Sequence, residues 1–370
     1  MEVCFIVFVV CTLIQLVFWW GLFSKLAFYK NVHEQKGKKE PEKVSIIVCA
    51  KNEADNLAKY LNRLLTQNYR SYEVIVVNHN STDQTAKVVR GFQQKFPYLR
   101  IVNTSNMKSY SQVGKKSALA EGIKSARHDV LLLTDADCEP NSDNWLEKMQ
   151  SLIHNEKNIV LGFSPYRKER GLLNLFIRYE TIYTAVQYFS FALAKMPYMG
   201  VGRNLAYRKH LFLETDGFKK HQHIVSGDDD LFINEVADSK NVAINIDRET
   251  FVFSDPKDTW RSYFKQKARH LTTGTAYKSK YKILLGLLSI THFGHYIGGL
   301  LLISQYSMLA AVVLLYLIRI ISVTVLHISL LRKFQDMSML KWIPLLDATY
   351  VLYYLIFTPY LFFGNRNQWT

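Results

Sequence analysis

Residues 44–83 run VSIIVCAKNE ADNLAKYLNR LLTQNYRSYE VIVVNHNSTD, with one apolar segment before and one after a more polar stretch. The first apolar segment, 44–49, is bounded by charge and predicts a strand. Helical spacing follows from about residue 53 to 66. The apolar face of this helix is made by Leu57, Tyr60, Leu61, Leu64 and Leu65. Residues 73–77 predict a second strand, followed by turn and N-cap side chains for another helix.

The same alternation continues along the chain. Apolar segments at 101–102 and 130–133 predict a third and a fourth strand, with a helix from about 114 to 125 between them. Strands that alternate with helices favour an α/β fold with a mostly parallel sheet. In such sheets ligands bind at the carboxyl ends of the strands, so those ends are where we expect a site.

Apolar segments near both ends of the chain predict transmembrane helices. The first runs from about Val3 to Phe23, carries no charge and is long enough to cross a bilayer. A cleaved signal peptide is disfavoured, because nothing basic precedes the run and Trp19 and Trp20 stand where small residues are needed. Three further spans are expected at about Ile283–Ser304, Met308–Leu331 and Ile343–Phe363.

Four polar residues lie inside the predicted C-terminal spans. Arg319 and Asp347 would be costly against lipid, so each is expected to face another helix. His292 and His295 are expected to form hydrogen bonds between helices rather than to bind a ligand.

The charges that flank the spans predict an orientation. Only Glu2 precedes the first span, and six lysines follow it: Lys25, Lys30, Lys36, Lys38, Lys39 and Lys43. Cytoplasmic flanks collect Lys and Arg, so the middle of the chain should face the cytoplasm, with the N-terminus and Thr370 outside. The expected divisions are an N-terminal span (1–24), a basic cytoplasmic linker (25–43), an α/β domain (44–282) and a three-span membrane domain (283–370).

Composition narrows the class of protein. The 370 residues are 49% hydrophobic, which excludes a disordered chain. The four cysteines are scattered, which excludes a disulfide scaffold. Much of the +15 net charge flanks the membrane segments and suits anionic membrane lipids. No basic, aromatic-interleaved motif is present, so a nucleic acid is not an expected partner.

Two acidic clusters are candidate sites. Asp135 and Asp137 follow the fourth strand, where hard carboxylate oxygens could hold Mg²⁺ or Mn²⁺ against a diphosphate. A turn or helix cap is the alternative. Asp228, Asp229 and Asp230 repel one another unless they face solvent, meet a cation or cap the helix that follows.

Two further segments have both a structural and a functional interpretation. Gln266, Arg269 and His270 lie at helical spacing before the second span. The structural interpretation is an amphipathic helix beside the membrane with solvated charges, and the functional one is a cluster of ligand-binding side chains. Residues 172–199 are rich in aromatics, which favours either core packing or an interfacial helix beside an acceptor.

Seven motifs, in this order along about 230 residues, give the chain a specific resemblance. They are VSIIVCAKNE from Val44, VVNHNSTDQT from Val76, GKKSALAEGI from Gly114, LLLTDADCEP from Leu131, MGVGRNLAYRK from Met199, SGDDDLF from Ser226 and QKARH from Gln266. Together with the flanking spans they resemble the family 2 glycosyltransferases of the GT-A fold. The resemblance is to the membrane-embedded branch that includes cellulose, chitin and hyaluronan synthases.

The resemblance implies roles for the acidic residues. Asp137, with Asp135, matches the motif that places a metal on the diphosphate of a nucleotide sugar. Asp229 or Asp228 matches the general base that takes a proton from an acceptor hydroxyl, in a single displacement that inverts configuration. Alignment on Gly-Asp-Asp favours Asp229 and alignment on Asp-Leu favours Asp228; we favour Asp229.

The resemblance also implies contacts to the donor and the acceptor. Arg269 and Gln266 match a motif whose arginine contacts the diphosphate, and Asn204 fits a contact to the donor or the acceptor sugar, of which we favour the acceptor. The remaining donor contacts would come from Lys51, Asn52, Glu53, Asn78, Asn80 and Lys115.

Two positions depart from the family pattern. Asn78-His79 stand where the family carries two aspartates, so uridine cannot be inferred as the base. His270 stands in place of a tryptophan at the acceptor end, which puts processive synthesis in doubt.

The sequence therefore predicts an inverting glycosyltransferase at the cytoplasmic face of a membrane, expected to be a bacterial inner membrane. Its donor would be a nucleotide sugar, and its acceptor a lipid, a lipid-linked sugar or a polysaccharide. One alternative is a processive synthase that exports its polymer. The alternative from another class is a non-catalytic sugar-nucleotide sensor, which would not hydrolyse the donor. Oligomeric state is not predicted.

Overall fold

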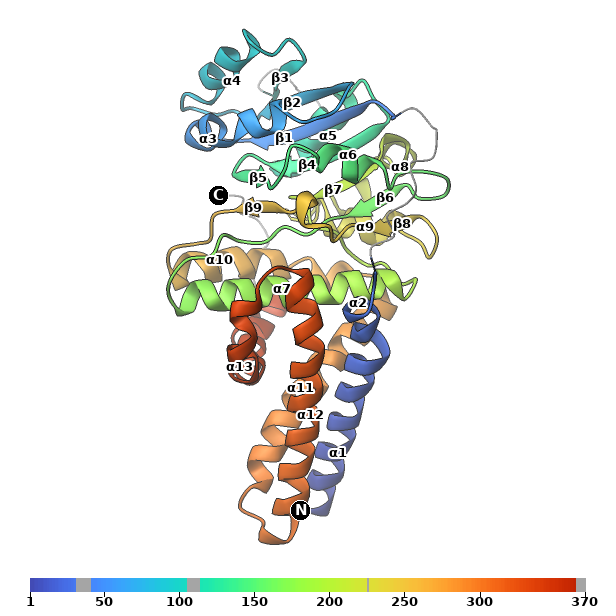
Figure 1. Ribbon diagram of the computed structural model, residues 1–370, viewed down its shortest axis with the longest axis vertical. Helices are drawn as coiled ribbons and strands as arrows, with labels where there is room; N and C mark the ends of the chain where they lie inside the picture. The colour runs from blue at the N-terminus through green and yellow to red at the C-terminus, as the bar shows by residue number, and fades with distance from the viewer. Residues whose placement is uncertain (31–40, 105–113, 225, 364–370) are drawn as a thin grey trace.

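The structure is a computed structural model that describes residues 1–30, 41–104, 114–224 and 226–363. An α/β domain lies at one end and a bundle of long helices at the other, and the N-terminus marks the far end of the bundle (Figure 1). Part of the predicted basic linker, including Lys36, Lys38 and Lys39, lies outside the described residues, as does Thr370.

The α/β domain is built on a seven-stranded sheet in the order β3-β2-β1-β4-β7-β6-β8. The strands are β1 (Val44–Ala50), β2 (Tyr72–Asn78), β3 (Leu99–Asn103), β4 (Val130–Asp135), β6 (Ile159–Leu161), β7 (Leu205–Arg208) and β8 (Val242–Ile244). The first four are parallel and β7 is antiparallel to both of its neighbours. A small second sheet pairs β5 (Cys138–Pro140) with β9 (Val252–Ser254). The predicted α/β class and the four predicted strands are confirmed.

Alternating side chains of the central strands feed two cores on opposite faces of the sheet. Ile47 and Leu131 pack in one core, and Ile46 and Leu132 in the other. The helices of this domain are α3 (Ala54–Leu65), α4 (Thr85–Gln93), α5 (Lys115–Ser125), α6 (Trp145–Gln150), α8 (Lys209–Glu214) and α9 (Asp230–Val236). Burial on both faces explains why the central strands are continuous apolar runs.

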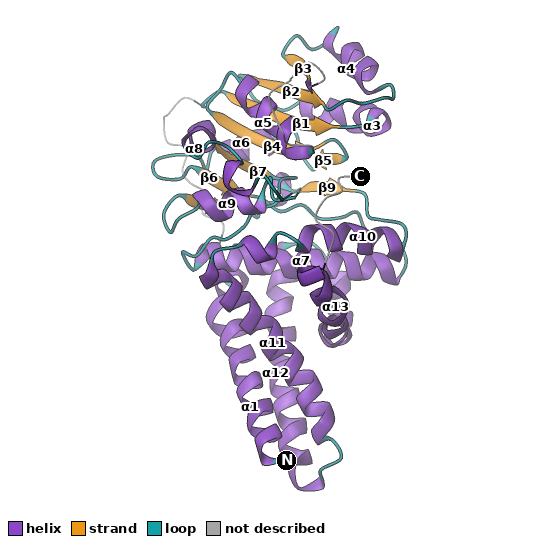
Figure 2. Cartoon of the chain, turned by 180° about the vertical axis from the view of Figure 1, so that it is seen from behind, coloured by secondary structure: helices purple, strands orange, loops and turns teal. Residues whose placement is uncertain are grey.

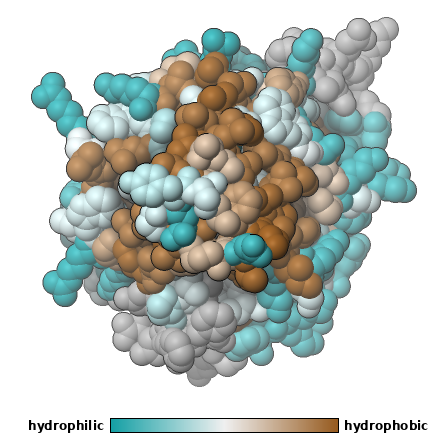
Figure 3. All heavy atoms as spheres, turned by 90° about the horizontal axis from the view of Figure 1, so that it is seen from below, coloured by the Kyte–Doolittle hydropathy of each residue, from teal (hydrophilic) through white to brown (hydrophobic). Residues whose placement is uncertain are grey.

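Four helical segments are long and apolar enough to cross a membrane. They are α1 (Glu2–Val17) with a π-helical turn (Phe18–Phe23) and α2 (Ser24–Ala27), then α11 (Ser279–Leu302), α12 (Tyr306–Lys333) and α13 (Ile343–Phe363). The first continues to Ala27, past the predicted limit at residue 24. Seen from below, apolar residues cover the end of the bundle and hydrophilic residues surround it (Figure 3). This distribution is the one expected of a protein whose bundle lies in lipid.

α11 runs antiparallel to α1 and α12, which share one direction, and the connections between the helices fix which ends lie beside the α/β domain. Ser329 Oγ near the end of α12 donates to Ala27 O at the end of α2, 2.8 Å away. At the opposite end, Phe8 of α1 packs with Leu302 and Val312. The end of α2 and the end of α12 therefore lie together on the domain side, as the predicted orientation requires.

Two helices lie crosswise between the sheet and the bundle: α7 (Leu172–Leu193) and α10 (Trp260–Leu271) (Figures 1 and 2). Glu180 of α7 pairs with Lys267 of α10 at 2.5 Å. α13 passes beneath them, with Phe357 and Phe264 ring centroids 5.5 Å apart. The aromatic segment from residue 172 is thus largely buried, as expected for core packing, and it lies at the border of the apolar bundle. Its predicted interfacial role beside an acceptor stays a prediction.

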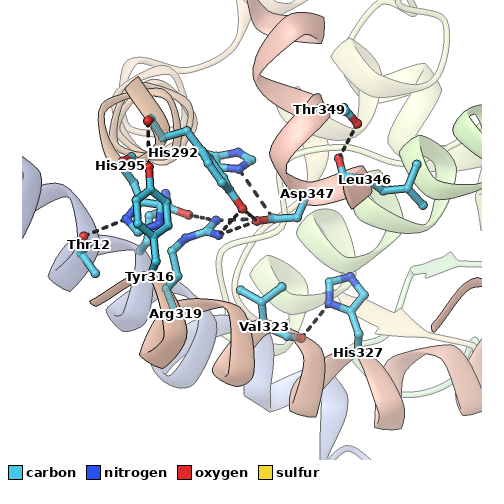
Figure 4. A network of polar contacts seen from close by, with 12 residues as sticks. Thr12, His292, His295, Tyr316, Arg319, Val323, His327, Leu346, Asp347 and Thr349 are labelled. Carbon is cyan, nitrogen blue, oxygen red and sulfur yellow. Dashed lines mark hydrogen bonds and ion pairs between the residues drawn. The ribbon is translucent and has the colours of Figure 1, made fainter. Parts of the chain in front are cut away.

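A buried polar network joins the membrane helices (Figure 4). Arg319 of α12 forms an ion pair with Asp347 of α13, and both side chains are 1% exposed. Arg319 Nη2 also donates to Gln15 Oε1 of α1 at 3.1 Å, and Tyr296 of α11 donates to Asp347 at 2.6 Å. His295 forms a hydrogen bond with Thr12 at 2.8 Å. The predictions that Arg319 and Asp347 face other helices and that His295 connects helices are confirmed.

Candidate active site

Two carboxylates gather where β4 ends. Asp135 is its last residue, and β1 and β2 end beside it, with Cys49 opposite Asp135 and Ala50 opposite Asn78. Ligand atoms of Asp135, Asp137 and Cys138 lie within 4.8 Å of one another. The sheet therefore presents the predicted metal motif at the edge where its parallel strands end.

The donor set at this edge suits a hard cation. The Cys138 thiol is buried, donates weakly to Asp137 Oδ1 at 3.4 Å, and burial raises its pKa. A protonated thiol is a poor ligand, so Asp135 and Asp137 remain as two oxygen donors. Mg²⁺ and Mn²⁺ are commonly held by one or two carboxylates together with phosphate oxygens, so this pair fits such a cation.

Lys115 connects this edge to the second acidic cluster. It is the first residue of α5, and its Nζ lies 2.7 Å from Asp135 Oδ1 and 3.3 Å from Asp228 Oδ2. The two acidic motifs, which the sequence could only place separately, therefore form one site. Among the residues that the structure describes, Lys115 is the cation paired with both clusters.

The three adjacent aspartates have different surroundings. Asp230 accepts hydrogen bonds from Thr273 and Tyr277 and so ties α9 to the segment after α10. Burial acts to raise the pKa of Asp228, but Lys115 and hydrogen bonding outweigh it and hold that pKa low. Asp228 is thus an ionised partner of lysine, and Asp230 is a buried connector.

Asp229 has the surroundings of a base. Burial, reinforced by Asp228 and Asp230, raises the pKa of its carboxyl to about 7. Its Oδ2 accepts the Gly202 N–H at 2.7 Å, and its Oδ1 accepts the N–H of Asp230 at the start of α9. A Cβ at residue 202 would lie 3.2 Å from Oδ2, so glycine permits this close approach. The geometry and the pKa favour Asp229 over Asp228 as the general base.

The loop after β1 contributes Glu53 and Asn52. Burial, with the charges of Asp137 and Asp135, raises the pKa of Glu53, so this side chain lies within the influence of the metal motif. Asn52 has a φ of 58°, and its Oδ1 accepts the N–H of Thr82 at 2.8 Å. Asn52 thus joins this loop to the one after β2, while its neighbour Lys51 is exposed.

The loop after β2 contributes Asn78 and Asn80. Asn78 is buried, and its Nδ2 donates to Asn103 Oδ1 at 2.9 Å. Within the described part of the chain its Oδ1 has no partner, and a nucleotide base edge could satisfy it. Asn80 is exposed with a φ of 51°.

The third predicted cluster lies along α10. Gln266 Nε2 donates to the Tyr166 hydroxyl at 3.4 Å, so it reaches the α/β domain rather than bulk solvent. Arg269 and His270 lie in the last turn, with His270 exposed. α10 thus places all three residues between the sheet domain and the bundle.

Most of the α/β domain is similar to one known protein family. Residues 45–210 match the family model "Glycosyl transferase family 2". They form a family 2 glycosyltransferase domain.

Two curated relatives are similar to the chain. The Bacillus subtilis (strain 168) protein named "Probable glycosyltransferase YdaM" is 26% identical over 261 residues, which cover 67% of this chain and 59% of the relative. "Glycosyltransferase AglE" of Haloferax volcanii is 30% identical over 193 residues, covering 50% and 58%. The chain therefore spans less than two thirds of the length of these relatives.

One solved structure shares the fold. The mannosyltransferase PcManGT from Pyrobaculum calidifontis, in complex with GDP-Man and Mn²⁺, matches with a TM-score of 0.60 at 16% identity. The match covers 95% of this chain and 98% of that one. It confirms the GT-A fold of the glycosyltransferase domain.

One predicted contact needs correction. Asn204 is fully buried in the glycosyltransferase domain, and its Oδ1 accepts from Trp145 Nε1 at 3.0 Å. Its Nδ2 donates to the carbonyls of Phe163 and Thr250. These bonds satisfy the amide group of Asn204, which argues against the predicted sugar contact. The side chain instead connects elements of the buried core by hydrogen bonds.

Two cations of this domain were not among the predicted site residues. Lys116 is buried, and its Nζ donates to His221 O and Ile224 O at 2.8 and 2.9 Å. It thereby fixes the segment that leads to the acidic cluster. Arg203, the second missed cation, follows Gly202. The sequence feature that could have indicated Lys116 is the pair of adjacent lysines at the start of a predicted helix. The feature that could have indicated Arg203 is its position within the motif MGVGRNLAYRK.

Proposed function

We propose that this protein is an inverting glycosyltransferase that moves a sugar from a nucleotide-sugar donor to an acceptor hydroxyl at the cytoplasmic face of a membrane. The observation that carries the proposal is the placement of Asp229. A carboxyl whose pKa is about 7 lies in the same site as the carboxylate pair Asp135 and Asp137, with Lys115 connecting the two clusters. A base and an anchor for a diphosphate are the two parts that sugar transfer needs.

Asp229 would act on the acceptor. Its ionised carboxylate takes the proton of the acceptor hydroxyl as that oxygen attacks the anomeric carbon. Gly202 N–H keeps one carboxylate oxygen in place, so the side chain needs no reorganisation before the proton moves. A single displacement assisted by one base inverts the configuration of the sugar.

Asp135 and Asp137 would hold the divalent cation, Mg²⁺ or Mn²⁺, and Lys115 would contact the phosphates. When bound, such a cation supplies Lewis-acid stabilisation of the charge that develops on the leaving diphosphate. Lys115 would exchange its contact with Asp135 for the phosphate oxygens, and keep Asp228 as its partner.

The membrane helices support an acceptor that lies at the bilayer surface. α10 carries Arg269 and His270 beside the bundle, which suits a lipid, a lipid-linked sugar or a polysaccharide. The lysines that flank the spans would contact anionic membrane lipids and place the domain in the cytoplasm. Nucleotide sugars would reach the site from there.

The proposal is tested with membranes that contain the protein and a panel of radiolabelled nucleotide sugars, followed by separation of lipid and polymer fractions. We expect one donor to label the lipid or glycan fraction in the presence of Mg²⁺ or Mn²⁺. Asp229→Asn is the matched control and should abolish the label. A protein that binds a nucleotide sugar but neither transfers nor hydrolyses it would establish the sensor alternative instead.

A further inference from the structure

Arg203 lies between the two halves of the site. The residue before it, Gly202, donates its N–H to Asp229. The Arg203 side chain reaches the other way, and its Nη1 donates to Ser254 Oγ at 2.6 Å. Ser254 is the strand partner of Cys138, the residue that follows Asp137. Arg203 thus lies between the base and the carboxylate pair.

Three contacts hold the guanidinium. Besides the bond to Ser254, its Nη2 donates to Ser164 O at 3.1 Å, and its Cζ lies 4.5 Å from the centre of the Tyr166 ring. Tyr166 is itself held by Gln266 of α10 through its hydroxyl. A guanidinium has five N–H donors, so Arg203 can keep both bonds and still donate to a ligand.

Arg203 differs from four other arginines of the domain in its partners. Arg63, Arg100, Arg167 and Arg208 each have a carboxylate within 4.0 Å. No such pair is formed by Arg203 with any described carboxylate. The Arg203 side chain is half-buried beside the two acidic motifs. Their negative charge stabilises the guanidinium at this position, but no carboxylate in the described part of the chain is close enough to form an ion pair with it. A half-buried guanidinium with this freedom suits a bidentate contact with a phosphate group.

We propose that Arg203 contacts the second phosphate of the bound nucleoside diphosphate, and that Tyr166 and Gln266 are positioning residues for it. This inference rests on the proposed function. As the bond between the anomeric carbon and the phosphate oxygen breaks, its electron pair stays on that oxygen. The acceptor oxygen forms the new bond, and its proton passes to Asp229. Arg203 stabilises the negative charge that collects on the leaving diphosphate.

The test measures binding of UDP and GDP to the purified full-length protein in the presence of Mn²⁺, with UMP and GMP as comparison ligands. Arg203→Gln should weaken binding of the preferred diphosphate about tenfold or more, because a charge-assisted hydrogen bond is lost. Binding of the matching monophosphate should change less than about twofold, because the lost contact is to the second phosphate. Gln266→Ala should shift the same ratio in the same direction by a smaller factor.

The controls separate binding from folding. Arg167→Gln removes an arginine of the same region whose partners are Glu139 and Asp255, and it should leave both affinities unchanged. Arg203→Lys keeps the positive charge but loses the planar, paired N–H donors of the guanidinium. Its affinity for the diphosphate should lie between those of Arg203→Gln and the unmodified protein. Equal loss of monophosphate and diphosphate binding, or no loss at all, would overturn the inference while the proposed function stands. If the unmodified protein binds none of UDP, GDP, ADP, CDP and dTDP, the proposed function fails as well.

Discussion

At the scale of single residues, the three adjacent carboxyl groups differ in their tendency to ionise because each has a different partner. Asp228 has Lys115, Asp230 has Thr273 and Tyr277, and Asp229 has one backbone N–H on each oxygen. The partner therefore decides which carboxyl stays ionised and which one can exchange a proton near neutral pH.

The pKa of Asp229 predicts the pH dependence of transfer. Because the base must be ionised, activity should rise with pH through about 7 and fall roughly tenfold per unit below it. Asp228→Asn removes a charge that raises this pKa, so it should move the acidic limb to lower pH. Initial rates measured from pH 5 to 9 with saturating donor decide the matter, and a limb near pH 4 in the unmodified protein would exclude Asp229 as the base.

Removal of the metal motif should stop transfer without unfolding the domain. Asp137→Asn, or chelation of the unmodified protein, should lower activity about a hundredfold or more, because stabilisation of the leaving diphosphate is lost. The thermal unfolding midpoint should stay within a few degrees of that of the unmodified protein. Full transfer by a metal-stripped preparation would remove the metal from this mechanism.

His270 predicts short products. An imidazole offers a smaller stacking face than an indole, so each product should leave before many further transfers. His270→Trp should lengthen the products, whereas Arg269→Ala should lower every transfer and leave their length unchanged. Product sizing by mass spectrometry is the measurement, and long polymer from the unmodified enzyme would favour the processive alternative.

At the scale of elements, the Arg319–Asp347 pair joins α12 to α13 in an apolar bundle. Asp347→Ala should lower the free energy of unfolding by about 3–5 kcal/mol, because it leaves a buried guanidinium without its carboxylate. The double variant Arg319→Met with Asp347→Leu should recover most of the loss. Thermal unfolding in detergent measures both, and Asp216→Asn, an exposed carboxylate, is the matched control. Equal loss in the single and double variants would argue against the pair as the cause.

The elements also show what sequence patterns can predict here. The strand that ends at Asp135 is predictable because four apolar residues and a polar turn are local features. The burial of Asn204 is not, since its partners Trp145 and Thr250 come from elements that only the folded sheet brings together. The same holds for Lys116, whose partners are two backbone carbonyls of a distant segment. Periodicity finds the strand ends, but not the contacts that select among the polar residues gathered there.

At the scale of the whole molecule, the predicted orientation can be tested at two described positions. Tyr306 is the exposed first residue of α12, and Ser338 is exposed in the short 3₁₀ helix (Met337–Trp342) before α13, so Tyr306→Cys and Ser338→Cys place a thiol at either end of the bundle. In a Cys4→Ser background, an impermeant thiol reagent applied to intact cells should label the first and not the second. Permeabilised cells should label both. The reverse pattern would place the glycosyltransferase domain outside the cytoplasm.

The contact between α1 and α11 has a consequence for how the chain is made. Gln15 Nε2 donates to Leu288 O, 273 residues further along the chain. A ribosome that adds about 5–20 residues per second needs about 14–55 s to supply that partner. Through this interval Thr12 and Gln15 are without His295 and Leu288. Until α11 is made, these polar side chains must therefore find other hydrogen-bond partners, such as lipid headgroups, water or another protein.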